Sequence, residues 1–178
     1  MLDARLKRSI RWLGDRTDPD LRADTTGWWR DAETLALLGP ALAALFPEAS
    51  PTVVVGPESH GSLLGPLVAS HVGTGFVAIE KDPGRSADSD AWLEVMTPPD
   101  YRDRQLRLGM RKTLLQAGDR VLFVDDWVAT GAQVEACRAL VGRSGAQWVG
   151  AAVVVDGCER PQVRRAVDLR ALVHVRDL

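Results

Sequence analysis

Lysine is scarce in this sequence, and so is net charge of either sign. Only Lys7, Lys81 and Lys112 carry an ammonium group, and the 178 residues have a net charge of −2. Proteins that bind nucleic acid or anionic membranes through their overall field carry a clear positive excess. The composition supports neither kind of partner, and we expect neither.

Cysteines and long hydrophobic runs are also rare. The two cysteines, Cys137 and Cys158, fit no zinc-binding spacing. We interpret them as reduced thiols, with a disulfide as the alternative. The longest apolar runs fall far short of the ~20 residues that span a bilayer. Residues 1–14 repeat apolar side chains at helical spacing and lack the apolar core of a signal peptide. These absences favour a cytoplasmic protein.

The rest of the composition is that of an ordinary globular domain. Hydrophobic residues make up 46% of the chain and charged residues 26%, which suits one domain over residues 1–178. Periodicity and capping residues predict helices at 3–13, 31–46, 62–72, 131–143 and 159–167. Short β-branched or alternating runs predict strands at 52–55, 75–79, 91–96, 101–108, 121–124, 147–155 and 171–175.

The alternation of strands and helices predicts an α/β fold. Such units form a central, mostly parallel sheet with helices on both faces, and ligands bind beyond the carboxyl ends of the strands. Two loops, 56–61 and 125–133, follow predicted strands at such ends. A third segment, about 82–100, is rich in Pro, Gly, Ser and Asp, and we interpret it as a flexible lid loop.

Two adjacent carboxylates follow one of the buried strands. Asp125 and Asp126 come directly after 121–124, and neighbouring carboxylates repel each other unless a cation or hydroxyl donors lie nearby. A vicinal diol supplies such donors, and Mg²⁺ supplies the cation. Thr130 and Gly131 then open a helix, whose free N–H groups and dipole favour a phosphate. These features predict a ribose-5-phosphate site.

The segment 121–133 resembles the motif with which type I phosphoribosyltransferases bind 5-phosphoribosyl-1-pyrophosphate (PRPP), an acidic pair followed by a Thr-Gly turn. The resemblance implies that Asp125 and Asp126 hold the ribose hydroxyls and serve catalysis. Mg²⁺ would be held mainly by PRPP, with the same two carboxylates as additional ligands. A receiver-type domain is the alternative, but its acidic pair lies near the N-terminus without a Thr-Gly helix start. The residues implied for the 5-phosphate are Ala129, Thr130, Gly131, Ala132 and Gln133.

The resemblance extends to the loop after the strand at 52–55, which is similar to the pyrophosphate loop of adenine phosphoribosyltransferases. It implies a strained peptide near Glu58-Ser59, and His60 stands where those enzymes usually have arginine. A solvated turn histidine is the alternative for His60. The next strand ends in Glu80-Lys81, where the family usually has Arg-Lys. The residues implied for PRPP here are Glu58, Ser59, His60, Gly61 and Lys81.

Near the N-terminus, Gly27-Trp28-Trp29-Arg30-Asp31 resembles the Val-Phe-Arg-Asp stretch that forms part of the family's hood over the base. It implies a hood made by about residues 1–30, with Trp28 and Arg30 binding the base. The alternative is that the two tryptophans cover the hydrophobic core.

The resemblance therefore predicts the type I phosphoribosyltransferase fold, a central sheet with a small hood. It implies a Mg²⁺-dependent transferase of purine salvage that moves the phosphoribosyl group from PRPP to a nucleobase and releases pyrophosphate. Adenine or another purine is the implied acceptor, and a cytoplasmic homodimer is the implied assembly. The alternatives are a non-catalytic PRPP sensor and a transferase with a non-purine acceptor. Because such sensors usually carry a DNA-binding domain, for which 178 residues leave no space, we expect an enzyme.

Overall fold

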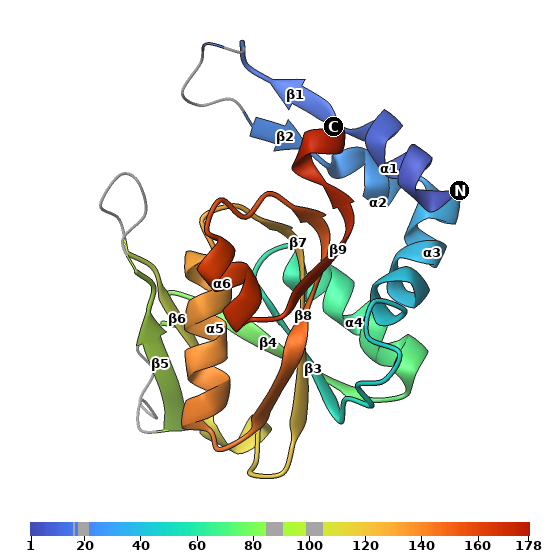
Figure 1. Cartoon of the computed structure of the whole chain (residues 1–178). Coiled ribbons are helices and arrows are strands. Elements are labelled where there is room, and N and C mark those ends of the chain that lie inside the picture. The colour runs from blue at the N-terminus through green and yellow to red at the C-terminus, as the bar shows by residue number, and fades with distance from the viewer. Residues whose placement is uncertain (16, 18–21, 85–90, 99–104) are drawn as a thin grey trace.

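A computed structural model places a seven-stranded sheet at the centre of the molecule (Figure 1). It describes residues 1–15, 17, 22–84, 91–98 and 105–178. The strand order is β5-β6-β4-β3-β7-β8-β9. In chain order the strands are β3 (Val53–Pro57), β4 (Gly75–Lys81), β5 (Trp92–Met96), β6 (Arg107–Arg111), β7 (Arg120–Val128), β8 (Gln147–Asp156) and β9 (Leu169–His174).

Five of these strands pair in parallel, and at one edge β6 runs in the opposite direction between β4 and β5. β4, β3, β7, β8 and β9 pair in parallel, whereas β6 is antiparallel to both β4 and β5. The carboxyl ends of β3 and β7 therefore lie side by side, with Val55 of β3 opposite Phe123 of β7. The mostly parallel sheet predicted from the sequence is confirmed.

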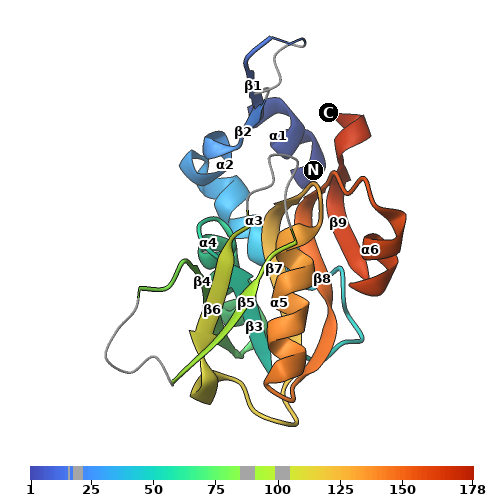
Figure 2. The same ribbon diagram turned by 90° about the vertical axis from the view of Figure 1, so that its left-hand side faces the viewer.

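Helices cover both faces of the sheet (Figure 2). α3 (Ala32–Ala43) and α4 (Gly61–Val72) pack on one face, and α5 (Ala132–Arg143) and α6 (Pro161–Ala166) on the other. The reason lies in the pleat, which points successive side chains of a strand to opposite faces. On β7, Phe123 packs on the α5 side and Val124 on the α3–α4 side, and both are fully buried.

The N-terminal segment forms a hood beside one end of the sheet (Figure 1). It consists of α1 (Leu2–Ser9), the hairpin of β1 (Arg11–Leu13) and β2 (Arg22–Asp24), and α2 (Thr26–Arg30). The predicted helix at 3–13 was too long, because Ile10 adopts extended backbone angles. The hydroxyl of Ser9 donates to the Arg5 and Leu6 carbonyls at this helix end.

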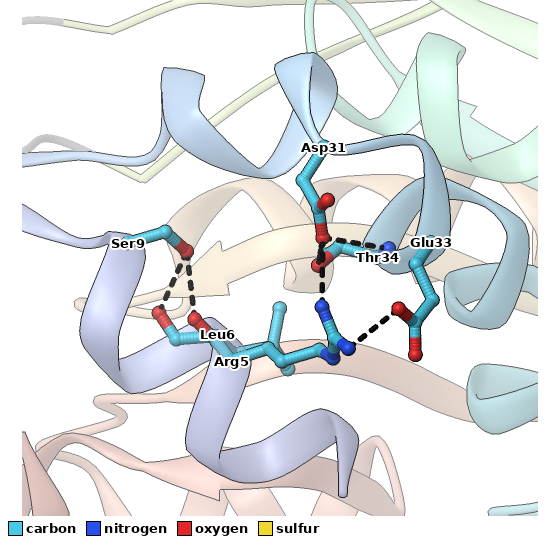
Figure 3. A network of polar contacts seen from close by, with 6 residues as sticks. All are labelled: Arg5, Leu6, Ser9, Asp31, Glu33 and Thr34. Carbon is cyan, nitrogen blue, oxygen red and sulfur yellow. Dashed lines mark hydrogen bonds and ion pairs between the residues drawn. The ribbon is translucent and has the colours of Figure 1, made fainter.

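Charge pairs tie the hood to α3 (Figure 3). The Arg5 guanidinium on α1 lies 3.5 Å from Asp31 and 2.5 Å from Glu33. Asp31 is also the N-cap of α3 and accepts hydrogen bonds from the backbone N–H and the hydroxyl of Thr34. The Asp31 carboxylate therefore caps α3 and also binds Arg5 of α1, which attaches the first helix of the hood to α3.

Other boundaries also differ from the prediction. β7 continues to Val128, because its pairing with β8 extends to Val128 opposite Asp156, so the acidic pair lies within the strand. The strand predicted at 101–108 is shifted to β6, and residues 101–104 lie outside the described ranges. The lid predicted at 82–100 is described only at 82–84 and 91–98, where β5 pairs with β6. Among the described residues, no helix has the length and apolar character to cross a membrane.

Candidate active site

Segments distant in the sequence meet at the carboxyl ends of β3, β7 and β8. The acidic pair lies near the end of β7, the loop 58–60 follows β3, and Gly157 follows β8. Hood side chains reach the same place, since Trp29 contacts the ring of His60 and Trp12 contacts that of Trp127. The site therefore lies between the sheet edge and the hood, where ligands of parallel α/β sheets are expected.

The two carboxylates of the acidic pair face opposite sides of the sheet. Asp125 continues the row of Phe123 toward α5, where Cys137 and Lys81 are its electrostatic neighbours. Asp126 points to the hood side, where its Oδ2 lies 2.6 Å from His60 Nδ1. The pleat accounts for this separation because both residues belong to β7. A ligand at the strand end would meet one carboxylate from each face.

Asp125 is buried, and its surroundings disfavour the charged form. Burial raises the pKa of the Asp125 carboxyl well above its usual range, and the negative charge of Asp126 raises it further. The Asp126 backbone N–H donates to Asp125 Oδ1 at 2.9 Å, and Lys81 supplies positive charge; both oppose the rise. Such a carboxylate gains from a hydroxyl donor or a cation at the site.

A small cavity lies where β7 turns into α5. Its volume is about 130 Å³. Gly131 adopts a left-handed backbone with φ of 82°, and a Cβ there would lie 2.7 Å from Val163 Cγ1 of α6, so only glycine fits. The Ala132 N–H donates to Thr130 Oγ1 at 3.4 Å, and the next N–H groups of the first turn of α5 suit an anion. The cavity is lined by Asp125, Trp127, Val128, Ala129, Thr130, Gly131, Ala132, Gln133 and Val134.

The cavity is held from the α6 side. The carbonyl of Ala129 accepts the Glu159 backbone N–H at 3.2 Å. Arg160 donates to the Thr130 carbonyl at 3.5 Å and pairs with Glu135 of α5 at 2.8 Å. The turn is therefore fixed by backbone and charged partners from the segment after β8. All the residues predicted for the 5-phosphate lie together around this one cavity.

The loop after β3 packs tightly against β7. A Cβ on Gly56 would lie 2.4 Å from the Gly61 carbonyl oxygen, and a Cβ on Gly61 would lie 2.9 Å from the Val124 carbonyl oxygen. Glycine at both positions therefore lets the loop close beside the acidic pair. The Glu58-Ser59 peptide bond between them is cis, so the peptide geometry departs from the ordinary trans form where an unusual peptide was predicted.

The Glu58 side chain reaches the end of β4 and not the acidic pair. Its Oε2 accepts the backbone N–H of Lys81 at 2.9 Å, and its own backbone N–H donates to the Ile79 carbonyl. Ser59 is exposed beside it. Glu58 therefore sets the position of Lys81, whose charge acts on Asp125 from the same face of the sheet.

Trp28 and Trp29 lie in different surroundings, and Trp28 does not lie where the base site was predicted. Trp28 is fully buried in the hood and donates its indole N–H to the Leu6 carbonyl oxygen at 3.1 Å. A side chain with no exposed surface has no face for a base, so the assignment of Trp28 to the base site was wrong. Trp29 instead lies against His60, with ring centroids 5.4 Å apart. Arg30 is exposed at the end of α2.

Sequence reasoning missed two further aromatic residues. Trp127 directly follows the acidic pair, and Trp12 of β1 meets it edge to face at a centroid distance of 6.3 Å. A Cβ on Gly157 would lie 2.8 Å from the Trp127 indole nitrogen, so that ring lies across the end of β8. A bulky aromatic residue inside the acidic-pair motif was a signal for Trp127. No local pattern indicated Trp12.

Two other features bear on the choice of site. In the described ranges no cluster of three or more His, Cys, Asp or Glu could hold a metal ion.

A larger cavity of about 630 Å³ lies along β5 and is lined by Trp92, Arg107 and Arg143 among others, but it contains none of the predicted site residues. The smaller cavity is the better candidate because it places a buried carboxyl with a raised pKa, Asp125, beside the first turn of a helix.

Comparison with known proteins places this arrangement in a family. The phosphoribosyl transferase domain family matches residues 37–175. An adenine phosphoribosyltransferase of Edwardsiella ictaluri is 36% identical over 152 residues, 85% of this chain and 80% of that protein. One from Streptomyces coelicolor is 35% identical over 151 residues, 83% of this chain and 79% of that protein.

Solved structures agree in fold. The adenine phosphoribosyltransferase of Rhodothermus marinus superposes with a TM-score of 0.82 at 31% identity, covering 98% of both chains. That of Thermoanaerobacter pseudethanolicus gives a TM-score of 0.86 at 24% identity, covering 98% of this chain and 99% of that one, and supports the fold alone. With the family match spanning most of its length and the acidic pair and helix start in place, this chain belongs to the phosphoribosyltransferase family.

Proposed function

We propose that this protein transfers the 5-phosphoribosyl group from PRPP to adenine and releases pyrophosphate. The observation that carries the proposal is the cavity at the end of β7, where Asp125 borders the N-terminus of α5. Relatives named adenine phosphoribosyltransferase support the choice of base. The reaction forms a bond from a ring nitrogen to the ribose carbon and breaks the bond from that carbon to the pyrophosphate oxygen, and the proton of the ring nitrogen is released.

The 5-phosphate binds at the cavity formed by residues 129–133. Backbone N–H groups at the start of α5 donate to its oxygens, and the helix dipole favours its charge. The Thr130 hydroxyl adds a further donor. Gly131 allows the close approach, and Val163 supports the turn from behind. This anchor fixes one end of the ribose, so the reacting carbon is held at a defined distance from the base.

Asp125 and Asp126 take the two ribose hydroxyls. Each carboxylate accepts a hydrogen bond from the diol, and the pair lies close to the positive charge that develops on the ribose as pyrophosphate leaves. A hydroxyl donor also relieves the cost of the buried Asp125 charge, which burial otherwise disfavours. The protein therefore contributes position and electrostatics, and no covalent intermediate is needed.

Pyrophosphate lies against the loop after β3 and near Lys81. The loop supplies Ser59 and Gly61 on either side of His60, and Glu58 sets the position of the Lys81 backbone. Phosphoribosyltransferases generally depend on Mg²⁺, which neutralises charge on the leaving pyrophosphate. The described residues offer no cage of their own, and Mg²⁺ commonly takes most ligands from substrate phosphates and water. This fits a cation held mainly by PRPP, with Asp125 or Asp126 adding a ligand.

The base binds between hood and sheet, with Trp29 as its aromatic neighbour. Trp29 is half-buried, and its indole N–H is buried without a hydrogen-bond partner in the described part of the chain. A buried donor of this kind costs about 1–3 kcal/mol if left unpaired, and a nitrogen acceptor of a purine could pair with it. Arg30 stays a candidate for the base or the adjacent phosphate. A cytoplasmic homodimer with one domain over residues 1–178 remains part of the proposal.

Incubation with PRPP, Mg²⁺ and a panel of nucleobases tests the function. Pyrophosphate release is measured, and the nucleotide product is identified by mass spectrometry. The proposal expects AMP from adenine, with little product from guanine, hypoxanthine or uracil. Product from a pyrimidine alone would contradict the purine assignment. PRPP binding without turnover on any base would favour the sensor instead.

A further inference from the structure

His60 joins two parts of the site that arise far apart in the sequence. Its Nδ1 lies 2.6 Å from Asp126 Oδ2, and its ring lies beside that of Trp29, with centroids 5.4 Å apart at a tilt of 46°. Asp126 belongs to β7, His60 to the loop after β3, and Trp29 to the hood. One side chain thus contacts both the carboxylate proposed for the ribose and the aromatic residue proposed for the base.

The hydrogen bond fixes which nitrogen of His60 carries a hydrogen. A carboxylate accepts hydrogen bonds, so Nδ1–H must be the donor toward Asp126 Oδ2. The backbone of His60 is held as well, because its carbonyl accepts the N–H groups of Leu63 and Leu64 in the first turn of α4. His60 is therefore restrained through its backbone carbonyl and through the contacts of its ring with Asp126 and Trp29.

Asp126 depends on this contact for its orientation. Its side chain is 17% exposed, and its other side-chain partner is the Asp125 carboxyl, with which it shares a hydrogen bond on the same strand. The neighbouring Asp125 carboxylate repels it. Without the His60 donor, the Asp126 carboxylate would turn toward Asp125 or solvent. With the donor in place, its Oδ2 is held against His60 at the end of β7.

We propose that His60 is a positioning residue for the transfer reaction. It orients Asp126 toward the ribose through its Nδ1–H, and Trp29 holds the imidazole in the plane that this bond requires. This inference rests on the proposed function and assigns His60 a role through Asp126. That role differs from direct contact with pyrophosphate, which the resemblance implied for this position.

Two amide variants separate these roles. In His60→Asn the side-chain amide N–H occupies the place of Nδ1–H and keeps the bond to Asp126. In His60→Gln the amide lies near the Nε2 end, and the bond is lost. We expect His60→Asn to retain kcat/KM for PRPP within about threefold and His60→Gln to lose about tenfold to a hundredfold, as is usual when the partner that orients a functional group is removed.

The Asp126→Ala background, which removes the acceptor oxygen, supplies the second readout. If His60 acts through Asp126, His60→Gln should lower kcat/KM no further in that background, because both changes remove the same interaction. Melting temperatures without ligand should be similar in all variants, which separates positioning from folding. Equal losses in the Asn and Gln variants, or a loss confined to Asn, would overturn the inference. Additive losses with Asp126→Ala would overturn it too.

Failure of the proposed function gives a different result. If wild type releases no pyrophosphate with any base, the proposed reaction is wrong. The stabilisation of the fold by PRPP and Mg²⁺ can still be compared among the variants. If PRPP and Mg²⁺ raise the melting temperature of His60→Asn but not that of His60→Gln, the positioning role is supported. Equal increases in the two variants contradict it. If wild type turns over and His60→Gln matches it, only the inference about His60 fails.

Discussion

The indole nitrogen of Trp28 donates a hydrogen bond to the carbonyl oxygen of Leu6 at 3.1 Å, and it thereby joins α2 to α1 inside the hood. Both side chains are fully buried. Trp29, one residue later, meets the Trp28 ring edge to face and also contacts His60. The two adjacent tryptophans therefore have separate tasks, one in folding the hood and one in facing the site.

Replacement of each tryptophan by phenylalanine should separate these tasks. Trp28→Phe removes the indole donor to the Leu6 carbonyl and reduces the packed volume of the hood. It should lower the free energy of unfolding by about 1–3 kcal/mol. Trp29→Phe should leave stability nearly unchanged and raise KM for adenine. Urea unfolding and steady-state kinetics measure the two effects. If Trp28→Phe is as stable as the wild type but has a raised KM for adenine, Trp28 belongs to the base site after all.

PRPP with Mg²⁺ should stabilise the fold, because the proposed diol and phosphate sites exist together in the folded chain. A ligand at a hundred times its Kd adds about 2.7 kcal/mol, and thermal melting measures the shift. The shift should vanish in the double variant Asp125→Asn/Asp126→Asn, which keeps the shape and removes both charges. An equal shift in the wild type and the variant would reject the assignment of the acidic pair.

Gly131→Ala should damage both the fold and the phosphate cavity. The left-handed backbone disfavours any Cβ, and this Cβ would lie 2.7 Å from Val163 Cγ1. We expect a loss of about 2–3 kcal/mol in the free energy of unfolding and a smaller stabilisation by PRPP. Gly142→Ala is the matched control, since a Cβ there in α5 meets nothing within 4 Å and should stabilise the helix. Equal effects at the two glycines would contradict the packing argument.

Asp31 should make stability depend on pH. The Thr34 hydroxyl, and then the Thr34 backbone N–H, lower the pKa of the Asp31 carboxyl below its usual 3.8. A lowered pKa in the folded state contributes stability above the usual value, and this is lost as pH falls through the folded pKa. The melting temperature gap between wild type and Asp31→Ala should therefore be largest near neutral pH and narrow below about pH 4.

Asp31→Asn is the control for this prediction, because asparagine also caps helices but carries no charge. The difference in melting temperature between Asp31→Asn and Asp31→Ala should stay nearly constant as the pH is lowered. If the difference in melting temperature between wild type and Asp31→Ala does not change from neutral pH to about pH 3, the charge of Asp31 contributes nothing to stability.

Glu80→Arg should tighten PRPP binding. The family usually has arginine at this position, and a carboxylate near pyrophosphate repels it. Arg107 of the neighbouring strand β6 pairs with Glu94 at 3.8 Å and not with Glu80. Calorimetry with PRPP and Mg²⁺ measures the change. Glu80→Gln should give a smaller gain, and unchanged affinity in both would place Glu80 away from pyrophosphate.

The sequence by itself determined the sheet and the chemistry of its carboxyl ends. The buried runs before Gly56 and Asp125 are short and bounded by glycine or acidic residues, so they identify parallel strands and the loops that follow them. The Thr130-Gly131 helix start needed no tertiary information either, because backbone conformation and free N–H groups are local properties. The same holds for the family resemblance, which depends on contiguous residues.

Tertiary structure decided how those residues face one another. β7 extends to Val128 only because β8 pairs with it, and this extension sends Asp125 and Asp126 to opposite faces. Likewise, nothing local distinguishes Trp28 from Trp29; the packing of α1 against α2 buries the first and leaves the second beside His60. Side-chain direction in a short helix or at a strand end depends on the partners that pack against it, and those partners come from distant parts of the chain.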